Sequence, residues 1–94
     1  MKESEFQKKV IDRIKREYPD AIIMKTDPKY IQGLPDLVAL YHGKYACFEV
    51  KKSDKSARRP NQEYYIEKLA DRGFAFFIYP ENFELVFDRL SRWF

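Results

Sequence analysis

Two carboxylates and a lysine occupy positions in the middle of the sequence that suit metal chemistry. Asp36 follows a segment rich in turn residues, and Glu49-Val50-Lys51 ends an apolar run thirteen residues later. Side chains alternate along a strand, so Glu49 and Lys51 would share one face of that run and Val50 the other. Oxygen donors such as these are the ligands that hard divalent cations prefer. The first question is therefore whether the fold brings these side chains together.

A predicted hairpin decides that question. The stretches Asp36–Tyr41 and Lys44–Lys51 read as strands, and His42-Gly43 between them is a two-residue turn with glycine in its second position. This turn places Asp36 directly opposite Glu49, with their Cβ atoms about 4.5–5.5 Å apart. The two strands should pair in the antiparallel sense.

Like charges that face each other across a strand pair destabilise it, so positive charge is expected between Asp36 and Glu49. Lys51 supplies one charge, and a divalent cation accounts better for two carboxylates. A turn at Gly43-Lys44 would instead place Asp36 opposite Lys51 and keep the cluster, whereas a slip of one residue would separate its members.

The spacing acid-x-Lys is weak support by itself. With 15 acidic residues in 94 positions, and lysine as common as it is here, about two such pairs are expected by chance. Two occur, Asp27-x-Lys29 and Glu49-x-Lys51, and a solvated strand end with a surface ion pair is the alternative interpretation. Context favours the second pair, because it ends an apolar strand, faces Asp36 and precedes a basic loop.

That basic loop holds more positive charge than the chain as a whole. The segment 51–59 contains five basic residues and one acid, and the net charge of the entire chain is +3. The basic residues are Lys51, Lys52, Lys55, Arg58 and Arg59. Such a cluster suits the phosphate backbone of a nucleic acid, and a solvated loop is the alternative.

The remaining pattern predicts one α/β domain over residues 1–94, with the order α-β-β-β-α-β-α around a mixed four-stranded sheet. Apolar residues at steps of four predict a helix over Glu3–Tyr18, and Ala21–Thr26 reads as a strand. A helix follows from Pro60 to about Gly73, with Gln62 on its apolar stripe. Phe74–Tyr79 is apolar throughout and predicts a strand buried on both faces, parallel to its neighbour.

Composition excludes several classes of protein. Apolar residues form 45% of the chain and aromatic residues 17%. Because disordered proteins have a lower apolar content, intrinsic disorder is excluded. A single cysteine, Cys47, excludes an internal disulfide and a zinc ribbon and suits the cytoplasm. The longest apolar run, Phe74–Tyr79, is too short to span a membrane.

The last predicted helix begins at Pro80-Glu81, ends at Phe94 and is apolar on more than one side. Phe83, Phe87, Leu90 and Phe94 form one stripe, and other apolar residues widen it. A helix of this kind is either deeply buried or lies at an interface. Because a chain of 94 residues offers little core, we expect a homodimer.

Taken together, three motifs resemble the VRR-NUC (virus-type replication-repair nuclease) family of the PD-(D/E)xK nuclease superfamily. They are Gly33-x-Pro35-Asp36, Glu49-x-Lys51 and Arg59-Pro60-x-Gln62, and the resemblance runs from Glu3 to about Tyr79. It implies a restriction-endonuclease-like fold and an endonuclease that uses Mg²⁺, with Mn²⁺ able to substitute. It also implies branched DNA such as four-way (Holliday) junctions as substrate, in a phage or bacterial intracellular setting.

The resemblance also implies roles for individual residues. Asp36, Glu49, the Val50 carbonyl and Glu3 would bind metal, Lys51 would orient or activate water, and Gln62 would support the site. Lys25, Lys52, Lys55, Arg58 and Arg59 would contact DNA. For Glu3 the alternatives are a helix-dipole residue or a position outside the helix, with Ser4 and Gln7 as a capping box.

Two further observations leave alternatives open. Lys25 is equally well an ordinary surface lysine, and the loop Lys29-Tyr30-Ile31-Gln32 is less basic than the resemblance would lead one to expect. A non-catalytic DNA-binding module with the same fold, or a protein-interaction domain built on the last helix, are the competing interpretations of function.

Overall fold

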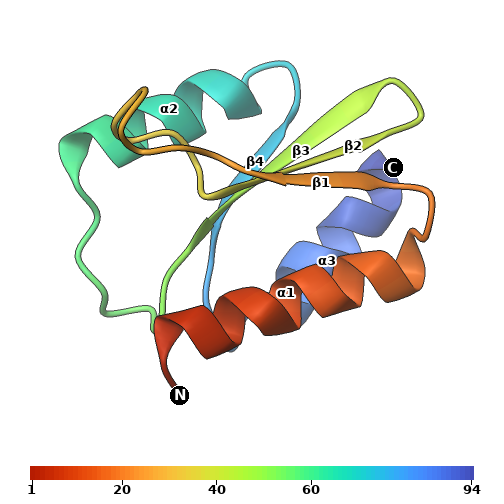
Figure 1. Ribbon diagram of the computed structural model, residues 1–94, viewed down its shortest axis with the longest axis horizontal. Helices are drawn as coiled ribbons and strands as arrows, with labels where there is room; N and C mark the ends of the chain where they lie inside the picture. The colour runs from red at the N-terminus through yellow and green to blue at the C-terminus, as the bar shows by residue number, and fades with distance from the viewer.

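A four-stranded mixed sheet with helices on both faces organises the chain (Figure 1). The computed structural model describes residues 1–94 and has the predicted order α-β-β-β-α-β-α, so the predicted fold class is confirmed. The elements are α1 (Glu3–Glu17), β1 (Ile22–Lys25), β2 (Leu37–Tyr41), β3 (Lys44–Val50), α2 (Pro60–Ala70), β4 (Phe74–Ile78), the 3₁₀ turn η1 (Pro80–Asn82) and α3 (Phe83–Trp93).

The strands lie in the order β1-β2-β3-β4. The pair β2–β3 is antiparallel and β3–β4 is parallel, both as predicted, and β1–β2 is antiparallel as well. His42 and Gly43 have φ values of 51° and 76°, so both turn residues lie in the left-handed region that a type I′ hairpin requires. The turn pairs Tyr41 with Lys44 and thereby sets the predicted register.

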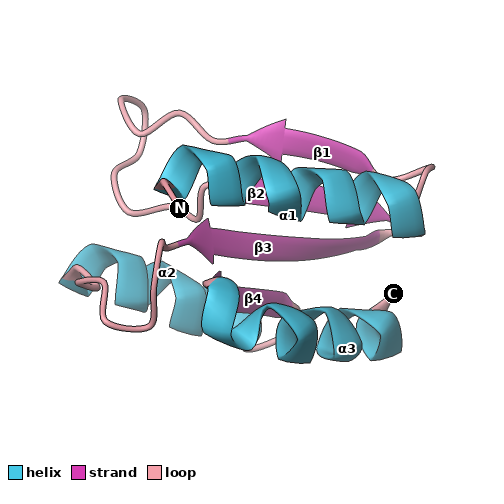
Figure 2. Cartoon of the chain, turned by 90° about the horizontal axis from the view of Figure 1, so that it is seen from below, coloured by secondary structure: helices cyan, strands magenta, loops and turns pink.

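The helices α1 and α3 cover one face of the sheet, and α2 lies on the other face (Figure 2). Under α1 and α3 lies the main core, to which β3 contributes Ala46, Phe48 and Val50. The opposite face of β3 therefore carries Tyr45, Cys47 and Glu49 toward α2. None of the helices combines the length and the apolar character that a bilayer crossing requires.

The helix α2 ends at Ala70, three residues earlier than predicted. The Tyr45 side chain packs at this end and donates a hydrogen bond from its hydroxyl to the Leu69 carbonyl, 2.6 Å away. A Cβ atom on Gly73 would lie 2.2 Å from the Tyr45 ring, so only glycine fits where the chain passes the ring.

The C-terminal helix differs from its prediction in two respects. It starts at Phe83 and not at Pro80, because Asn82 closes a 3₁₀ turn by accepting from the Tyr79 N–H (2.9 Å) and donating to the Phe77 carbonyl (2.9 Å). Its apolar stripe is buried within the chain's own core: Phe83, Val86, Phe87 and Leu90. The helix therefore gives no argument for a dimer, and the homodimer stays a prediction.

Candidate active site

The register of the hairpin carries Asp36 to the end of β3. Because Leu37 pairs with Phe48, the next position of the same ladder places Asp36 opposite Glu49. The Asp36 Oδ2 atom accepts a hydrogen bond from the Val50 N–H at 3.0 Å. The two carboxylates thus lie side by side on the face of the sheet that carries α2.

Pro35 ends the pairing of β2 with β3 at this point. It is the residue opposite Val50, where an antiparallel partner would donate its N–H to the Val50 carbonyl, and proline has no N–H. The Pro35 carbonyl accepts instead from the Thr26 hydroxyl at 2.7 Å. The Val50 carbonyl is therefore left beside the two carboxylates without the donor that a regular ladder would supply.

Glu49 is the most confined carboxylate of the site, with 4% of its surface exposed. Its Oε2 atom accepts a hydrogen bond from the Gln62 side-chain amide at 3.2 Å. Its Oε1 atom is buried and has no hydrogen-bond partner. A buried polar atom without a partner is costly and uncommon, so this oxygen has the character of a ligand atom.

Burial shifts both carboxylates toward protonation, and for Glu49 the charge on Asp36 adds to the shift. Burial, together with the charge on Asp36 and against the opposing charge on Lys51, raises the pKa of Glu49 to about 7. Burial also raises the pKa of Asp36, while the hydrogen bond from Val50 and the charge on Lys51 lower it. The site therefore favours extra positive charge, either as a proton or as a bound cation.

Lys51 and Gln62 complete the site beside the Asp36 and Glu49 carboxylates. The Lys51 ammonium donates to Gln62 Oε1 at 2.9 Å and lies 3.7 Å from Glu49 Oε2. Gln62 Oε1 also accepts from the Arg59 N–H at 3.1 Å, so three contacts fix the orientation of the amide. The position of Gln62 follows from Pro60 as the first residue of α2.

Glu3 lies in the first turn of α1 and is exposed. The helix begins at Glu3 with Lys2 as its cap, so the alternative in which Ser4 caps the helix is wrong. The charge on Glu3 contributes to the raised pKa of Glu49, so Glu3 acts on the site through its charge. No three His, Cys, Asp or Glu residues come close enough together to hold a metal ion, however, so Glu3 does not complete a cluster with Asp36 and Glu49.

The predicted DNA-contacting residues of the loop after β3 are exposed, and none forms an ion pair: Lys52, Lys55, Arg58 and Arg59. The loop is ordered by a hydrogen bond from the Asp54 N–H to Glu81 at 3.2 Å. The Arg58 guanidinium lies 4.3 Å from the centre of the Phe77 ring, and Phe77 pairs with Glu49 across β3 and β4. This aromatic support was not predicted, because it depends on the parallel register of β4.

Lys25 is not part of the carboxylate cluster. It pairs with Leu37, which lies in the core under α1, and paired residues share a face of the sheet. Its side chain therefore starts from the face opposite to that of Asp36 and Glu49, at the same end of the sheet.

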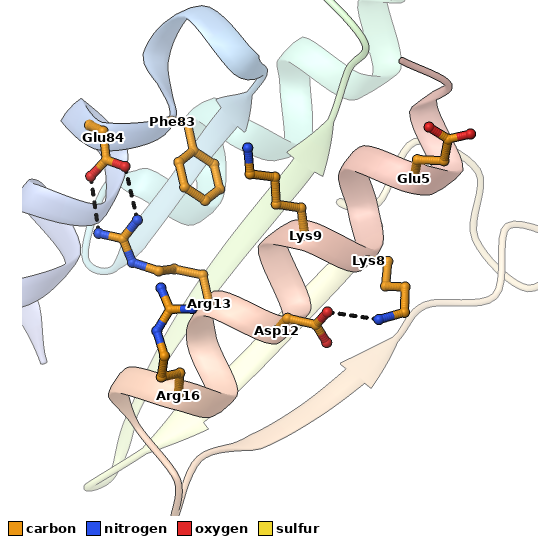
Figure 3. Close-up of a pocket in the computed structure, with 8 residues that line it drawn as sticks. All are labelled: Glu5, Lys8, Lys9, Asp12, Arg13, Arg16, Phe83 and Glu84. Carbon is orange, nitrogen blue, oxygen red and sulfur yellow. Dashed lines mark hydrogen bonds and ion pairs between the residues drawn. The ribbon is translucent and has the colours of Figure 1, made fainter.

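The largest hollow of the surface, about 430 Å³, lies between α1 and α3 and contains none of the predicted site residues (Figure 3). Several of its charged side chains are paired: the two terminal guanidinium nitrogens of Arg13 donate to Glu84 at 3.0 Å, and Lys8 contacts Asp12 at 2.8 Å. Glu5 also lines this hollow, away from the site. The hollow is a seam between two helices and not the candidate site.

Comparison with models of protein families, with curated proteins and with solved structures produced no match. Fold and site define a small α/β domain in which two carboxylates, a lysine and a glutamine converge at the carboxyl end of β3.

Proposed function

We propose that the protein is a divalent-metal-dependent endonuclease that hydrolyses phosphodiester bonds in DNA, of the VRR-NUC type that its motifs resemble. The observation that carries this proposal is the buried Glu49 Oε1 atom, which has no hydrogen-bond partner and lies in a carboxylate pair beside Lys51. In a structural ion pair, buried carboxylate oxygens normally have hydrogen-bond partners.

The donor atoms fit a hard cation such as Mg²⁺, with Mn²⁺ as a substitute. Asp36, Glu49 and the Val50 carbonyl would hold it, because all three present oxygen at the carboxyl end of β3 and Pro35 lacks the N–H that would bond to the carbonyl. Glu3 would add charge from α1 without joining the cluster. When bound, Mg²⁺ lowers the pKa of a water molecule and polarises a phosphoryl oxygen.

The chain's own residues then orient the reactants. Lys51, held by Gln62 and Glu49, presents an ammonium group that would hydrogen-bond the attacking water and stabilise negative charge at the phosphate. Gln62 acts through Lys51 and Glu49 as a positioning residue, since it bonds to both. The buried setting strengthens these interactions, because little water competes for them.

Unpaired basic side chains support DNA as the partner. Lys52, Lys55, Arg58 and Arg59 lie in the loop that leaves the site at the end of β3, have no acidic partners and would bind phosphates without reading sequence. Lys25 would reach a phosphate only from the other face of the sheet. Branched DNA, a homodimer with paired sites and a phage or bacterial cytoplasmic setting are parts of the proposal that rest on the resemblance.

The experiment is cleavage of labelled four-way junction, flap and linear duplex DNA in Mg²⁺, Mn²⁺ or EDTA, comparing wild type with Asp36→Asn. We expect cutting that needs metal, is strongest on branched DNA and falls more than about 100-fold in the variant. Asp20→Asn is the matched control, because Asp20 is exposed and makes no side-chain hydrogen bond or ion pair.

Full activity of Asp36→Asn would refute the site. DNA binding without cutting by wild type on any substrate would favour the non-catalytic DNA-binding module.

A further inference from the structure

Tyr30 is the most exposed aromatic side chain of the protein. Of the seven Tyr, eight Phe and one Trp residues, only Tyr30 and Tyr64 are exposed, at 84% and 53%. Tyr64 contacts the Tyr65 ring and accepts a hydrogen bond from Lys68 at 3.2 Å. The Tyr30 ring makes no aromatic, cation–π or hydrogen-bond contact, so no such partner competes with a stacking ligand.

The turn that presents Tyr30 is ordered. The N–H groups of Tyr30 and Ile31 both donate to the Asp27 carbonyl, at 3.1 and 3.4 Å. The Lys29 N–H donates to the Asp27 carboxylate at 2.8 Å. The backbone that carries the Tyr30 ring is therefore fixed in a turn that points the side chain into solvent.

The same loop is anchored at the candidate site. Its two ends are joined by a hydrogen bond from the Thr26 N–H to the Asp36 carbonyl at 3.0 Å, so the loop closes on the carboxylate residue itself. On the other side Gly33, at φ 92°, fits so tightly against Asn61 that an added Cβ would lie 2.8 Å from that side chain. Asn61 precedes Gln62, and Figure 1 shows the loop beside α2.

We propose that Tyr30 is a specificity-determining residue that stacks on an unpaired or terminal base of the DNA substrate next to the cut. This inference rests on the proposed function and narrows its substrate class. Aromatic side chains stack on any base whose face is open, whereas the interior of a duplex hides its base faces. Lys29, exposed and without an ion pair, lies beside Tyr30 to hold the adjoining phosphate.

A single exposed apolar side chain is common and needs no function. Two observations separate Tyr30 from that case: the turn beneath it is fixed by three hydrogen bonds to Asp27, and the loop ends at Asp36. A base that stacks on Tyr30 would therefore be held in a defined relation to the carboxylates. The substrate class that follows is DNA with a branch, flap or frayed end, not continuous duplex.

The test measures binding in EDTA, so that it does not depend on cleavage. The probes are a flap, a four-way junction and a duplex closed by hairpins at both ends, each with 2-aminopurine in place of an adenine at the branch or at the centre. We expect Tyr30→Ala to lose about tenfold in affinity for flap and junction and to bind the closed duplex as wild type does. Tyr30→Phe should retain the affinity, and Tyr64→Ala is the matched control.

Quenching of 2-aminopurine at the branch by wild type and Tyr30→Phe, but not by Tyr30→Ala, would establish the stacking contact. Equal affinities of wild type and Tyr30→Ala for the flap and junction, or an equal loss on the closed duplex, would overturn the inference and leave the nuclease proposal intact. Absence of any DNA binding by wild type would overturn both.

Discussion

Glu49 shows at the level of one residue why the site is costly without a cation. Its carboxylate is 4% exposed, one oxygen has no partner, and burial with the neighbouring Asp36 raises its pKa to about 7. The folded protein therefore keeps a proton on Glu49 at pH values where the unfolded chain has released it. The stability of the metal-free protein must fall as the pH rises from 4.5, the ordinary pKa, to about 7.

Glu49→Gln should remove the fall in stability that the metal-free protein shows as the pH rises. In EDTA above neutral pH, we expect the variant to be more stable than wild type by up to about 3 kcal/mol, with the difference disappearing in acid, where Glu49 is neutral. Denaturant unfolding across this pH range measures it. Glu67→Gln, on the exposed side of α2, is the control and should follow wild type. If the stability of wild type did not depend on pH in this range, the charge of Glu49 would already be stabilised in the folded protein without a proton or a cation.

The meeting of Asp36 with Glu49 could be predicted from sequence, because a two-residue turn fixes the partner of every residue in the hairpin. The hydrogen bonds of the Gln62 side chain could not be predicted from the sequence, although the position of Gln62 on the apolar stripe of α2 could. These bonds depend on the position at which the basic loop places Pro60, the first residue of α2, relative to the end of β3. No local sequence pattern encodes that position. The same holds for Arg58 on Phe77, which requires the parallel pairing of β4 with β3.

At the scale of elements, Arg13 ties α1 to α3. Its guanidinium contacts both oxygens of Glu84 and lies 5.3 and 4.8 Å from the centres of the Phe83 and Phe87 rings. The Arg13 side chain is 18% exposed and that of Glu84 is 76% exposed. The stacked, partly buried guanidinium should therefore contribute more than the ion pair itself.

Arg13→Ala should lower the free energy of unfolding by about 1 to 2 kcal/mol at neutral pH, and Glu84→Gln by less. Arg13 lowers the pKa of Glu84, so the contribution of that carboxylate is present above its ordinary pKa and is lost as the pH falls. The difference between Glu84→Gln and wild type should vanish in acid, while the effect of Arg13→Ala persists. Arg16→Ala, which lines the same hollow without a partner, is the control for denaturant unfolding. Equal losses in Arg13→Ala and Arg16→Ala would contradict the bridging role.

The same scale explains which elements the sequence predicts well. The helix α1 and the strands have strong periodicity or unbroken apolar runs, and their observed bounds lie within a few residues of the prediction. The start of α3 was wrong, because the Asn82 side chain bonds to the backbone of β4 and its end, and thereby favours a 3₁₀ turn after Pro80. A bond between a side chain and a neighbouring element leaves no periodic signal in the sequence.

At the scale of the whole molecule, the small size of the chain gave a wrong expectation about how α3 is buried. A chain of 94 residues was expected to lack room for so apolar a helix, yet α1 and α3 together cover one face of the sheet and bury the stripe between them. On α3 the one large apolar residue that is exposed, Leu85, lies outside this stripe, and three further exposed apolar residues share the outer face of the first two strands: Ile22, Met24 and Leu40. A homodimer would therefore have to use a surface other than the α3 stripe.

Metal binding should stabilise the entire fold, because a cation that binds only the native carboxylate pair shifts the unfolding equilibrium by mass action. At ten times its dissociation constant, Mg²⁺ would add about 1.4 kcal/mol, which corresponds to a rise of about 7 °C in the melting temperature of a domain of this size. Asp36→Asn and Glu49→Gln should lose this rise, and Asp20→Asn should keep it. KCl at the same ionic strength serves as the control for screening, since the basic loop would respond to any salt. An equal rise in wild type and Asp36→Asn would mean that Mg²⁺ acts on the general surface charge. The unpartnered oxygen of Glu49 would then need a different explanation from a metal ion.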